Sequence, residues 1–153
     1  MFSFNGKFDV IENEELLLSV IEKNPGDAVQ LPFYYYDIFC KADGAAVGKI
    51  SVRIGHNYHS YYNGNIGYEI DEDHRDRGLA YQACKLVFPV ARFHGMDVLY
   101  LTCGEDNAPS YKTIEKLGAE LIEICEPPQD YFAWYEGMAR QRIYRLKLNR
   151  DAT

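Results

Sequence analysis

Two arginines and a glycine stand where an extended segment gives way to a segment with helical spacing. The junction reads Arg75-Asp76-Arg77-Gly78-Leu79-Ala80. The first backbone N–H groups of a helix have no partner inside the helix, and the helix dipole adds partial positive charge to them. Gly78 would let a ligand approach the backbone closely, and the two arginines would add full positive charge. The junction therefore predicts an anion site that suits a pyrophosphate.

A second cluster of polar residues opens the helical segment 107–117. Asn107 is a typical helix N-cap, and Pro109 lies in the first turn, where its missing N–H costs little. Gly118 stands where the helix should end. Ser110 lies in the same first turn as Pro109. Its position suits a hydroxyl that completes the helix N-terminus.

The elements that must position these residues follow from the hydrophobic periodicity. Apolar or alternating runs predict strands at 6–11, 33–41, 46–55, 66–71, 98–103, 119–125 and 141–148. Helical spacing predicts helices at 12–23, 79–94 and 107–117. Pro89 should kink or shorten the second of these helices. The segments 56–65 and 126–139 are predicted as irregular, which gives the element order β-α-β-β-β-α-β-α-β-β.

Length and charge argue against several classes of protein. The chain has 153 residues and a formal net charge of −7, so we expect one domain, 1–153, that binds no nucleic acid, because such binding depends on neutralising phosphate charge. No apolar run approaches the roughly 20 residues of a membrane helix. The N-terminus lacks the pattern of a signal peptide. We therefore expect a cytoplasmic protein without membrane contact.

The four cysteines are not expected to bind a metal. Cys40, Cys84, Cys103 and Cys125 form no C-x-x-C pair and have no histidine at zinc-like spacing. Each of them lies in an apolar segment. They are therefore predicted to be reduced core residues, and no metal is predicted.

Known glycine motifs narrow the interpretation of the junction 75–80. It contains neither a G-x-G-x-x-G pattern nor a G-K-[ST] pattern. It does match [Q/R]-x-x-G-x-[G/A], and so resembles the acetyl-CoA loop of the GNAT N-acetyltransferase superfamily. The segment N-A-P-S-Y-K-T-I-E-K-L-G-A, residues 107–119, is similar to the branch that includes ribosomal-protein N-terminal acetyltransferases. The element order also matches the superfamily, least clearly before residue 30.

The resemblance implies an α/β fold, the GNAT acyl-CoA N-acyltransferase fold. Its central sheet is mixed but mostly antiparallel, with about seven strands and three to four flanking helices. The strands 66–71 and 98–103 should splay apart, so that the pantetheine of acetyl-CoA pairs with backbone groups that would otherwise lack partners. The implied contacts are the backbone of Glu69 and Ile70 for pantetheine, that of 75–80 for the pyrophosphate, and Asn107 and Ser110 near the thioester.

The same resemblance implies an N-acetyltransferase that moves an acetyl group from acetyl-CoA to a primary amine by direct attack. Glu69 is the candidate general base, acting directly or through water, although a glutamate at a strand end is commonly only solvated. Many GNAT enzymes place a tyrosine acid seven residues after the asparagine, where this chain has Ile114. Ser110 is the candidate acid by analogy with the ribosomal-protein branch. Tyr111 is the alternative, but an adjacent helical residue points about 100° away.

The variable aromatic segments are predicted to hold the amine acceptor. The candidates are His56, Tyr58, His59, Tyr61 and Tyr62 in the segment 56–62, and Tyr131, Phe132, Trp134 and Tyr135 in the segment 131–135. Alternatively, these aromatics pack a small second core or a homodimer contact. The acceptor stays open between a small molecule and a protein N-terminus. An alternative function also stays open, a non-catalytic acyl-CoA-binding sensor or interaction module on the same fold, because the usual tyrosine is missing.

Overall fold

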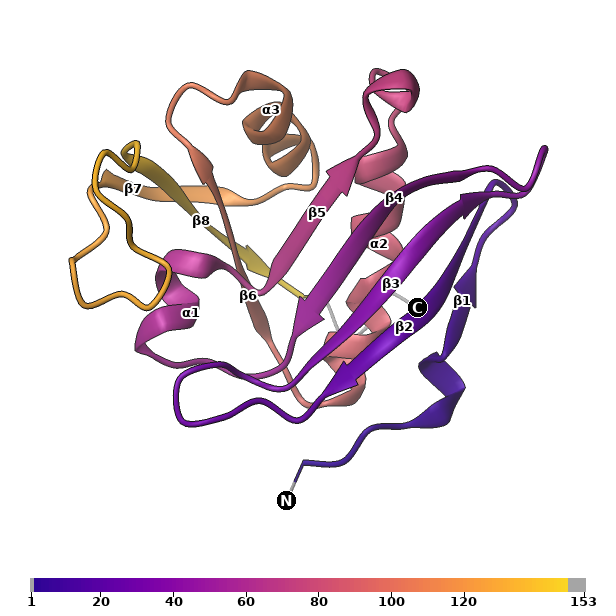
Figure 1. The fold of residues 1–153 in the computed structure, drawn as a ribbon, viewed down its shortest axis with the longest axis horizontal. Helices are drawn as coiled ribbons and strands as arrows, with labels where there is room; N and C mark the ends of the chain where they lie inside the picture. The colour runs from indigo at the N-terminus through magenta and orange to yellow at the C-terminus, as the bar shows by residue number, and fades with distance from the viewer. Residues whose placement is uncertain (1, 149–153) are drawn as a thin grey trace.

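Residues 2–148, the part of the chain that the computed structural model describes, form two β-sheets joined at one end and open at the other (Figure 1). The first sheet has the order β1-β2-β3-β4-β5, and the second has the order β6-β8-β7. The strands are β1 (Val10–Glu12), β2 (Leu16–Asn24), β3 (Phe33–Cys40), β4 (Ala46–Arg53), β5 (Ile66–Ile70), β6 (Val98–Gly104), β7 (Glu120–Cys125) and β8 (Gln141–Lys147). All pairings within these sheets are antiparallel. The predicted mostly antiparallel α/β architecture is confirmed.

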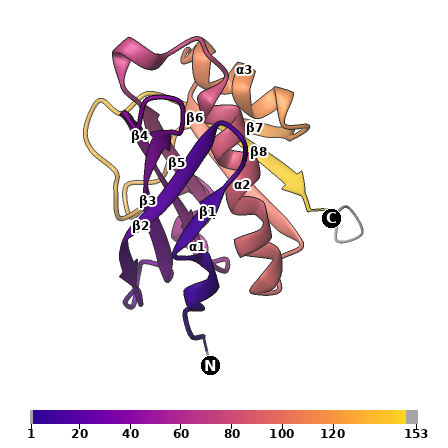
Figure 2. The same cartoon turned by 90° about the vertical axis from the view of Figure 1, so that its right-hand side faces the viewer.

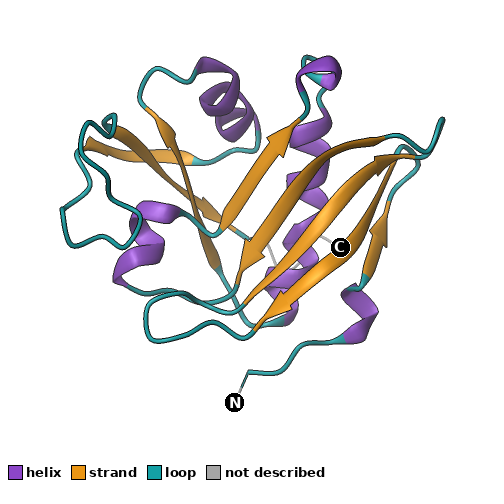
Figure 3. Ribbon diagram, viewed as in Figure 1, coloured by secondary structure: helices purple, strands orange, loops and turns teal. Residues whose placement is uncertain are grey.

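Helices cover the sheets and fill the space between them. They are α1 (Tyr58–Asn63), α2 (Leu79–Phe93) and α3 (Ala108–Lys116), with the short 3-10 helices η1 (Gly6–Phe8) and η2 (Glu72–His74). Figure 1 and Figure 2 show α2 lying behind the five-stranded sheet, and Figure 3 marks the helices in purple. The side of α2 that faces the sheet is apolar and buried, with Ala83, Val87 and Val90 inaccessible to solvent. The helix continues through Pro89 to Phe93, so the proline does not end it.

The segment 12–23 is extended, and the helix predicted there is wrong. Strand β2 covers most of it and lies between β1 and β3. Leu16 and Leu18 are completely buried, whereas Ile21 is 48% exposed. A run of consecutive leucines satisfies both the helical and the strand period, and pairing on both sides decides in favour of the strand. In the preceding segment 6–11, η1 replaces the first part of the predicted strand.

The segment 56–65, predicted as a loop, contains helix α1. Asn57 and Ser60 cap its N-terminus reciprocally: the Asn57 side chain accepts from the Ser60 N–H (2.7 Å), and the Ser60 hydroxyl accepts from the Asn57 N–H (2.9 Å). This capping box is a local signal that the tyrosines and histidine of the segment obscured. The predicted irregular segment 126–139 contains no helix or strand.

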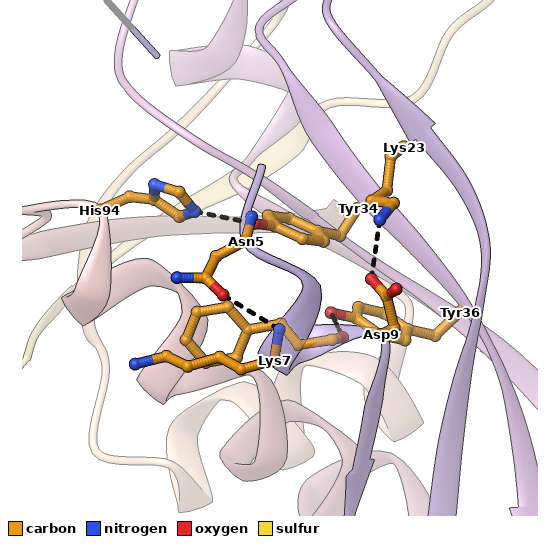
Figure 4. Close-up of polar contacts among 8 residues, drawn as sticks. Asn5, Lys7, Asp9, Lys23, Tyr34, Tyr36 and His94 are labelled. Carbon is orange, nitrogen blue, oxygen red and sulfur yellow. Dashed lines mark hydrogen bonds and ion pairs between the residues drawn. The ribbon is translucent and has the colours of Figure 1, made fainter. Parts of the chain in front are cut away.

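Polar contacts fasten the N-terminal segment to β3 (Figure 4). The Tyr34 hydroxyl accepts from the N–H of Asn5 (2.9 Å) and contacts Nε2 of His94, just beyond α2 (2.9 Å). The Tyr36 hydroxyl donates to the carbonyl of Phe8 (2.7 Å). Burial lowers the pKa of His94, so the neutral ring can accept from Tyr34. These contacts tie the N-terminal segment, β3 and the end of α2 into one unit.

Asn65 joins the two sheets at one end of the gap between β5 and β6. Its backbone N–H donates to the carbonyl of Tyr100 (2.6 Å), and its side-chain Oδ1 accepts from the N–H of Tyr100 (2.9 Å). Its Nδ2 donates to the carbonyls of Arg53 (3.1 Å) and Gly55 (2.9 Å), and the residue is completely buried. Beyond Asn65 the two strands are not paired and diverge, as Figure 1 shows. The predicted splay is therefore confirmed.

Asn65→Ala should lower the free energy of unfolding by about 3–5 kcal/mol, because it leaves several buried backbone groups without partners. Asn63→Ala is the matched control, since Asn63 accepts a single side-chain hydrogen bond, from Tyr131 (3.0 Å). We expect that change to cost about 1 kcal/mol. Urea unfolding of both variants checks the difference. Similar small losses in the two proteins would show that Asn65 does not hold the sheets together.

Candidate active site

A cleft of about 620 Å³ lies between β5 and the first turns of α2 and α3. It is lined by Tyr68, Glu69, Ile70, His74, Arg75, Asp76, Gly78, Leu79, Ala80, Tyr81, Asn107, Pro109, Ser110, Lys112 and Thr113. We call it the cleft. It brings together all of the sequence-predicted catalytic and cofactor-binding residues except Arg77. Three segments that are distant in the sequence therefore meet where the two sheets diverge.

The loop between β5 and α2 leaves backbone N–H groups without partners. Asp76 and Gly78 have φ angles of 65° and 71°, in the left-handed region. No side chain caps α2, and within residues 2–148 the N–H groups from Asp76 to Tyr81 donate no hydrogen bond. A Cβ on Gly78 would meet no atom within 4 Å, so the space over this glycine is open. These N–H groups and the helix dipole form the predicted kind of anion site.

The two arginines of the loop point in different directions. Arg75 lines the cleft, and its Nε donates to the carbonyl of Ile70 (3.2 Å). Arg77 lies outside the cleft, with one guanidinium nitrogen 3.0 Å from Nδ1 of His74 and the other 3.8 Å from the sulfur of Cys40. Spacing of two residues in an irregular loop does not fix which side an arginine takes. Lys112 on α3 supplies a cation to the cleft that the sequence pattern did not single out.

The edge of β5 that faces β6 carries unpaired backbone groups. Glu69 lies opposite Lys49 of β4, and Asp71, two residues further on, donates its N–H to β4 (2.8 Å). Alternate residues of an antiparallel pair turn their backbone groups to the same edge of the strand. The backbone N–H and carbonyl of Glu69 therefore point toward β4, and those of Tyr68 and Ile70 point toward the gap. The backbone contact expected from Glu69 therefore does not fit this register. Tyr68 takes its place beside Ile70.

Three polar side chains meet at the inner end of the cleft. The Asn107 side chain accepts from the N–H of Ser110 (3.4 Å) and so caps α3. The Ser110 hydroxyl lies 3.0 Å from the hydroxyl of Tyr68. Burial raises the pKa of Tyr68 to about 12, and the hydrogen bond with Ser110 opposes that shift. Tyr68 is therefore protonated at neutral pH and can donate a proton. The sequence pattern did not single out this residue, although it directly precedes Glu69 in the predicted strand.

The position of the usual tyrosine acid and the alternative acid Tyr111, both on α3, lie outside the lining of the cleft. Ile114, at the position of the usual tyrosine, is 1% exposed and belongs to the hydrophobic core. Tyr111 packs against that core, and the guanidinium of Arg142 lies 4.0 Å from the centre of its ring. Neither residue lines the cleft. The hydroxyl side chains that do are Tyr68, Tyr81, Ser110 and Thr113.

The cysteines are not activated thiols. Cys84 is completely buried, and burial raises its pKa to about 12. Burial also raises the pKa of Cys103. Cys40 is buried as well, whereas Cys125 is half-buried. The prediction of core cysteines is confirmed for the first three, and a thiolate nucleophile is disfavoured at neutral pH.

A second cavity, of about 520 Å³, lies on the face of the five-stranded sheet opposite α2. Its lining is Glu22, Gln30, Phe33, Tyr35, Lys49, Ser51, Arg53, Asn63, Gly67, Tyr68, Glu69, Phe132 and Ala133. On β3 and β4 these residues alternate with core residues such as Tyr36 and Ile50, so they point away from α2. We call it the sheet cavity. Glu69 and Tyr68 line both the cleft and the sheet cavity.

All but one of the predicted acceptor-binding aromatics line neither cavity. His56 packs edge-on against Tyr100, and the Tyr58 hydroxyl donates to Asp130 (2.6 Å). The Tyr61 hydroxyl donates to Glu123, and Trp134 is half-buried in its loop. The exception is Phe132, which lines the sheet cavity beside Ala133 and Asn63. Side-chain direction in these irregular segments depends on contacts between them, which the sequence does not reveal.

Comparison with known proteins identifies the family. A family model described as an acetyltransferase (GNAT) domain matches residues 7–120. This chain therefore belongs to the GNAT acetyltransferase family, whose members are acetyl-CoA-dependent N-acetyltransferases. A search of curated proteins gave no match.

Solved structures share the fold at low sequence identity. A GNAT-family acetyltransferase from Bacillus anthracis is 15% identical, with a TM-score of 0.66 over 90% of this chain and 98% of that one. The Salmonella typhimurium acetyltransferase that modifies the N-terminal serine of ribosomal protein L7/L12 is 19% identical, with a TM-score of 0.58 over 76% and 64%. The microcin C7 self-immunity acetyltransferase, solved with acetyl-CoA and AMP, is 20% identical, with a TM-score of 0.58 over 75% and 61%.

Within 2–148, no three His, Cys, Asp or Glu side chains are grouped so that they could hold a metal ion. None of the helices in this part of the chain is long and apolar enough to cross a membrane.

Gly78→Ala should weaken coenzyme A binding at least tenfold, because a methyl group would occupy the open space over the anion site and αL backbone would be disfavoured. Gly118→Ala is the matched control, since Gly118 also has a positive φ, 94°, and open space around its Cβ position. Both changes should cost about 1 kcal/mol of stability. Isothermal calorimetry separates them: equal coenzyme A affinities in the two variants would contradict the assignment of the loop.

Proposed function

We propose that this protein transfers the acetyl group of acetyl-CoA directly to a primary amine that binds in the sheet cavity. The observation that carries this proposal is the position of Glu69, which lines both the cleft and the sheet cavity. A group at that junction can reach an acceptor on one side and the thioester on the other. Proximity of the two reactants supplies much of the rate enhancement in such reactions.

The cleft suits acetyl-CoA as the co-substrate. The N–H groups from Asp76 to Tyr81 would bind the pyrophosphate, and Arg75 and Lys112 would add positive charge. The backbone groups of Tyr68 and the N–H of Ile70, whose carbonyl already accepts from Arg75, would pair with the pantetheine amides, as an additional strand would. The thioester would then lie near Ser110, at the inner end of the cleft.

Glu69 would hold the proton that the amine loses. The amine nitrogen forms a bond to the carbonyl carbon of the acetyl group, the carbon–sulfur bond breaks, and the carboxylate of Glu69 accepts a proton directly or through water. No cation of the described residues lies within 4 Å of that carboxylate, which leaves it available as a base. Direct transfer agrees with the buried state of Cys84 and Cys103, which argues against a covalent thiol intermediate.

Ser110 would supply a proton to the departing thiolate. Its hydroxyl is hydrogen-bonded to Tyr68, whose raised pKa keeps that phenol protonated. The pair can therefore act as a relay in which Ser110 donates and Tyr68 replaces the proton. This arrangement takes over the role for which the family commonly uses a tyrosine at the position of Ile114.

A coenzyme A release assay over a chemically varied amine panel tests the function. We expect release with at least one primary amine, either a small molecule or a peptide N-terminus, and none with the N-acetylated forms. Coenzyme A should also raise the melting temperature. A raised melting temperature without release over the whole panel would contradict the proposal and favour the non-catalytic acyl-CoA sensor.

Glu69→Gln should lower kcat about 100-fold or more, because the amide cannot accept the proton. Coenzyme A affinity should stay unchanged, because the substitution leaves the backbone of β5 in its place in the sheet. Glu72→Gln is the control: Glu72 lies in η2, is exposed, and lines neither cavity. Steady-state kinetics decides, and equal kcat values for the two variants would remove Glu69 from the mechanism.

A further inference from the structure

The guanidinium of Arg53 lies in the sheet cavity without a carboxylate partner. Its Nη1 donates to the carbonyls of Gly64 (2.9 Å) and Asn63 (3.5 Å). Among residues 2–148 no acidic side chain lies within 4 Å of it. Every fully buried side-chain nitrogen in this part of the chain has a hydrogen-bond partner, so the remaining donors of Arg53 reach the open space of the cavity. Burial lowers its pKa, and the nearby phenol of Tyr131 opposes that shift.

Gly67 brings this guanidinium close to the candidate base. A Cβ at Gly67 would lie 3.0 Å from Nη2 and 3.5 Å from Nη1 of Arg53, so the guanidinium folds over this glycine. Gly67 and Glu69 are two residues apart in β5 and share the face that lines the sheet cavity. Their Cα atoms are therefore about 7 Å apart. A side chain at this position would press on the guanidinium, which would have to shift.

Two other charged side chains of the sheet cavity, Lys49 and Glu22, already have partners of their own. The ammonium of Lys49 is paired with Asp37 at 2.6 Å. Glu22 accepts a hydrogen bond from Asn24 (2.8 Å) and lies on β2, three strands away from β5. The cavity is thus divided: a free carboxylate at Glu69 and a free guanidinium at Arg53, at a separation that a small molecule can span.

We infer that the acceptor is a primary amine that also carries a carboxylate, with the amine at Glu69 and the carboxylate on Arg53. Arginine is well suited to this task because its planar fork can bind both carboxylate oxygens. This inference rests on the proposed function and adds the substrate class to it. An amino acid whose amine and carboxylate are separated by a few bonds is of the size set by the roughly 7 Å between the Cα atoms of Gly67 and Glu69.

Calorimetry with matched ligand pairs tests the inference without requiring turnover. The probes are the standard amino acids, β-alanine and 4-aminobutyrate, each as the free acid and as its carboxamide. They are titrated into the protein with and without saturating coenzyme A. At least one free acid should bind at least tenfold more tightly than its amide. Equal affinities throughout, tighter binding of the amides, or no binding of any probe would overturn the inference.

Arg53→Gln should remove the preference for the free acid while the affinity for the amide stays within about threefold. Arg145→Gln is the matched control, since Arg145 pairs with Glu120 on the surface of the second sheet (3.8 Å). Gly67→Ala is a second variant that keeps the charge but displaces the guanidinium, and it should reduce the preference as well. A preference unchanged in both Arg53→Gln and Gly67→Ala would place the carboxylate elsewhere.

The two proposals fail in different ways. Acid-selective binding that depends on Arg53, without any coenzyme A release, would contradict acetyl transfer and keep the carboxylate site. Coenzyme A release with amines that lack a carboxylate, and no selectivity for free acids, would keep acetyl transfer and overturn the carboxylate site. In active protein, kcat/KM for a free acid over that for its amide should fall at least tenfold in Arg53→Gln.

Discussion

The hydrogen bonds of Asn65 determine where this protein can bind a ligand. They join β5 to β6 at Tyr100 and saturate every polar group of a completely buried side chain. Beyond that point the two strands have free edges, because nothing pairs them. A gap with unpaired backbone groups is costly unless solvent or a ligand fills it. We therefore place the proposed site at the open ends of the sheets and not in a cavity in the core.

The strand β5 separates two kinds of chemistry. Its backbone edge at Tyr68 and Ile70 faces the cleft, while the side chain of Glu69 and the open face over Gly67 line the sheet cavity. Strand alternation alone produces this division. One short strand can thus hold a co-substrate along its edge and an acceptor over its face, with the candidate base between them. Arg53, which folds over Gly67, extends the second function along the same strand.

Local signals in the sequence predicted the cofactor side of the site and missed most of the acceptor side. Three local features carry this prediction: the αL glycine, the helix start after it and the Asn107 cap. Each depends only on residues close to it in the sequence, so the sequence pattern was sufficient to predict their conformation. The sheet cavity depends on the register of β3, β4 and β5, which juxtaposes Arg53 with Gly67 across strands. The helix predicted at 12–23 failed for a related reason, since strand pairing overrode a periodicity compatible with both structures.

The central claim is that the free edge of β5 and the N–H groups at the start of α2 bind coenzyme A. Amide hydrogen exchange, followed by NMR with and without coenzyme A, measures this directly. The account predicts slower exchange at Tyr68, at Ile70 and from Asp76 to Tyr81, and no change at Asn65 and Tyr100, whose N–H groups are already bonded. Binding that leaves the amides of β5 and α2 unchanged, or that protects only the sheet cavity, would contradict it.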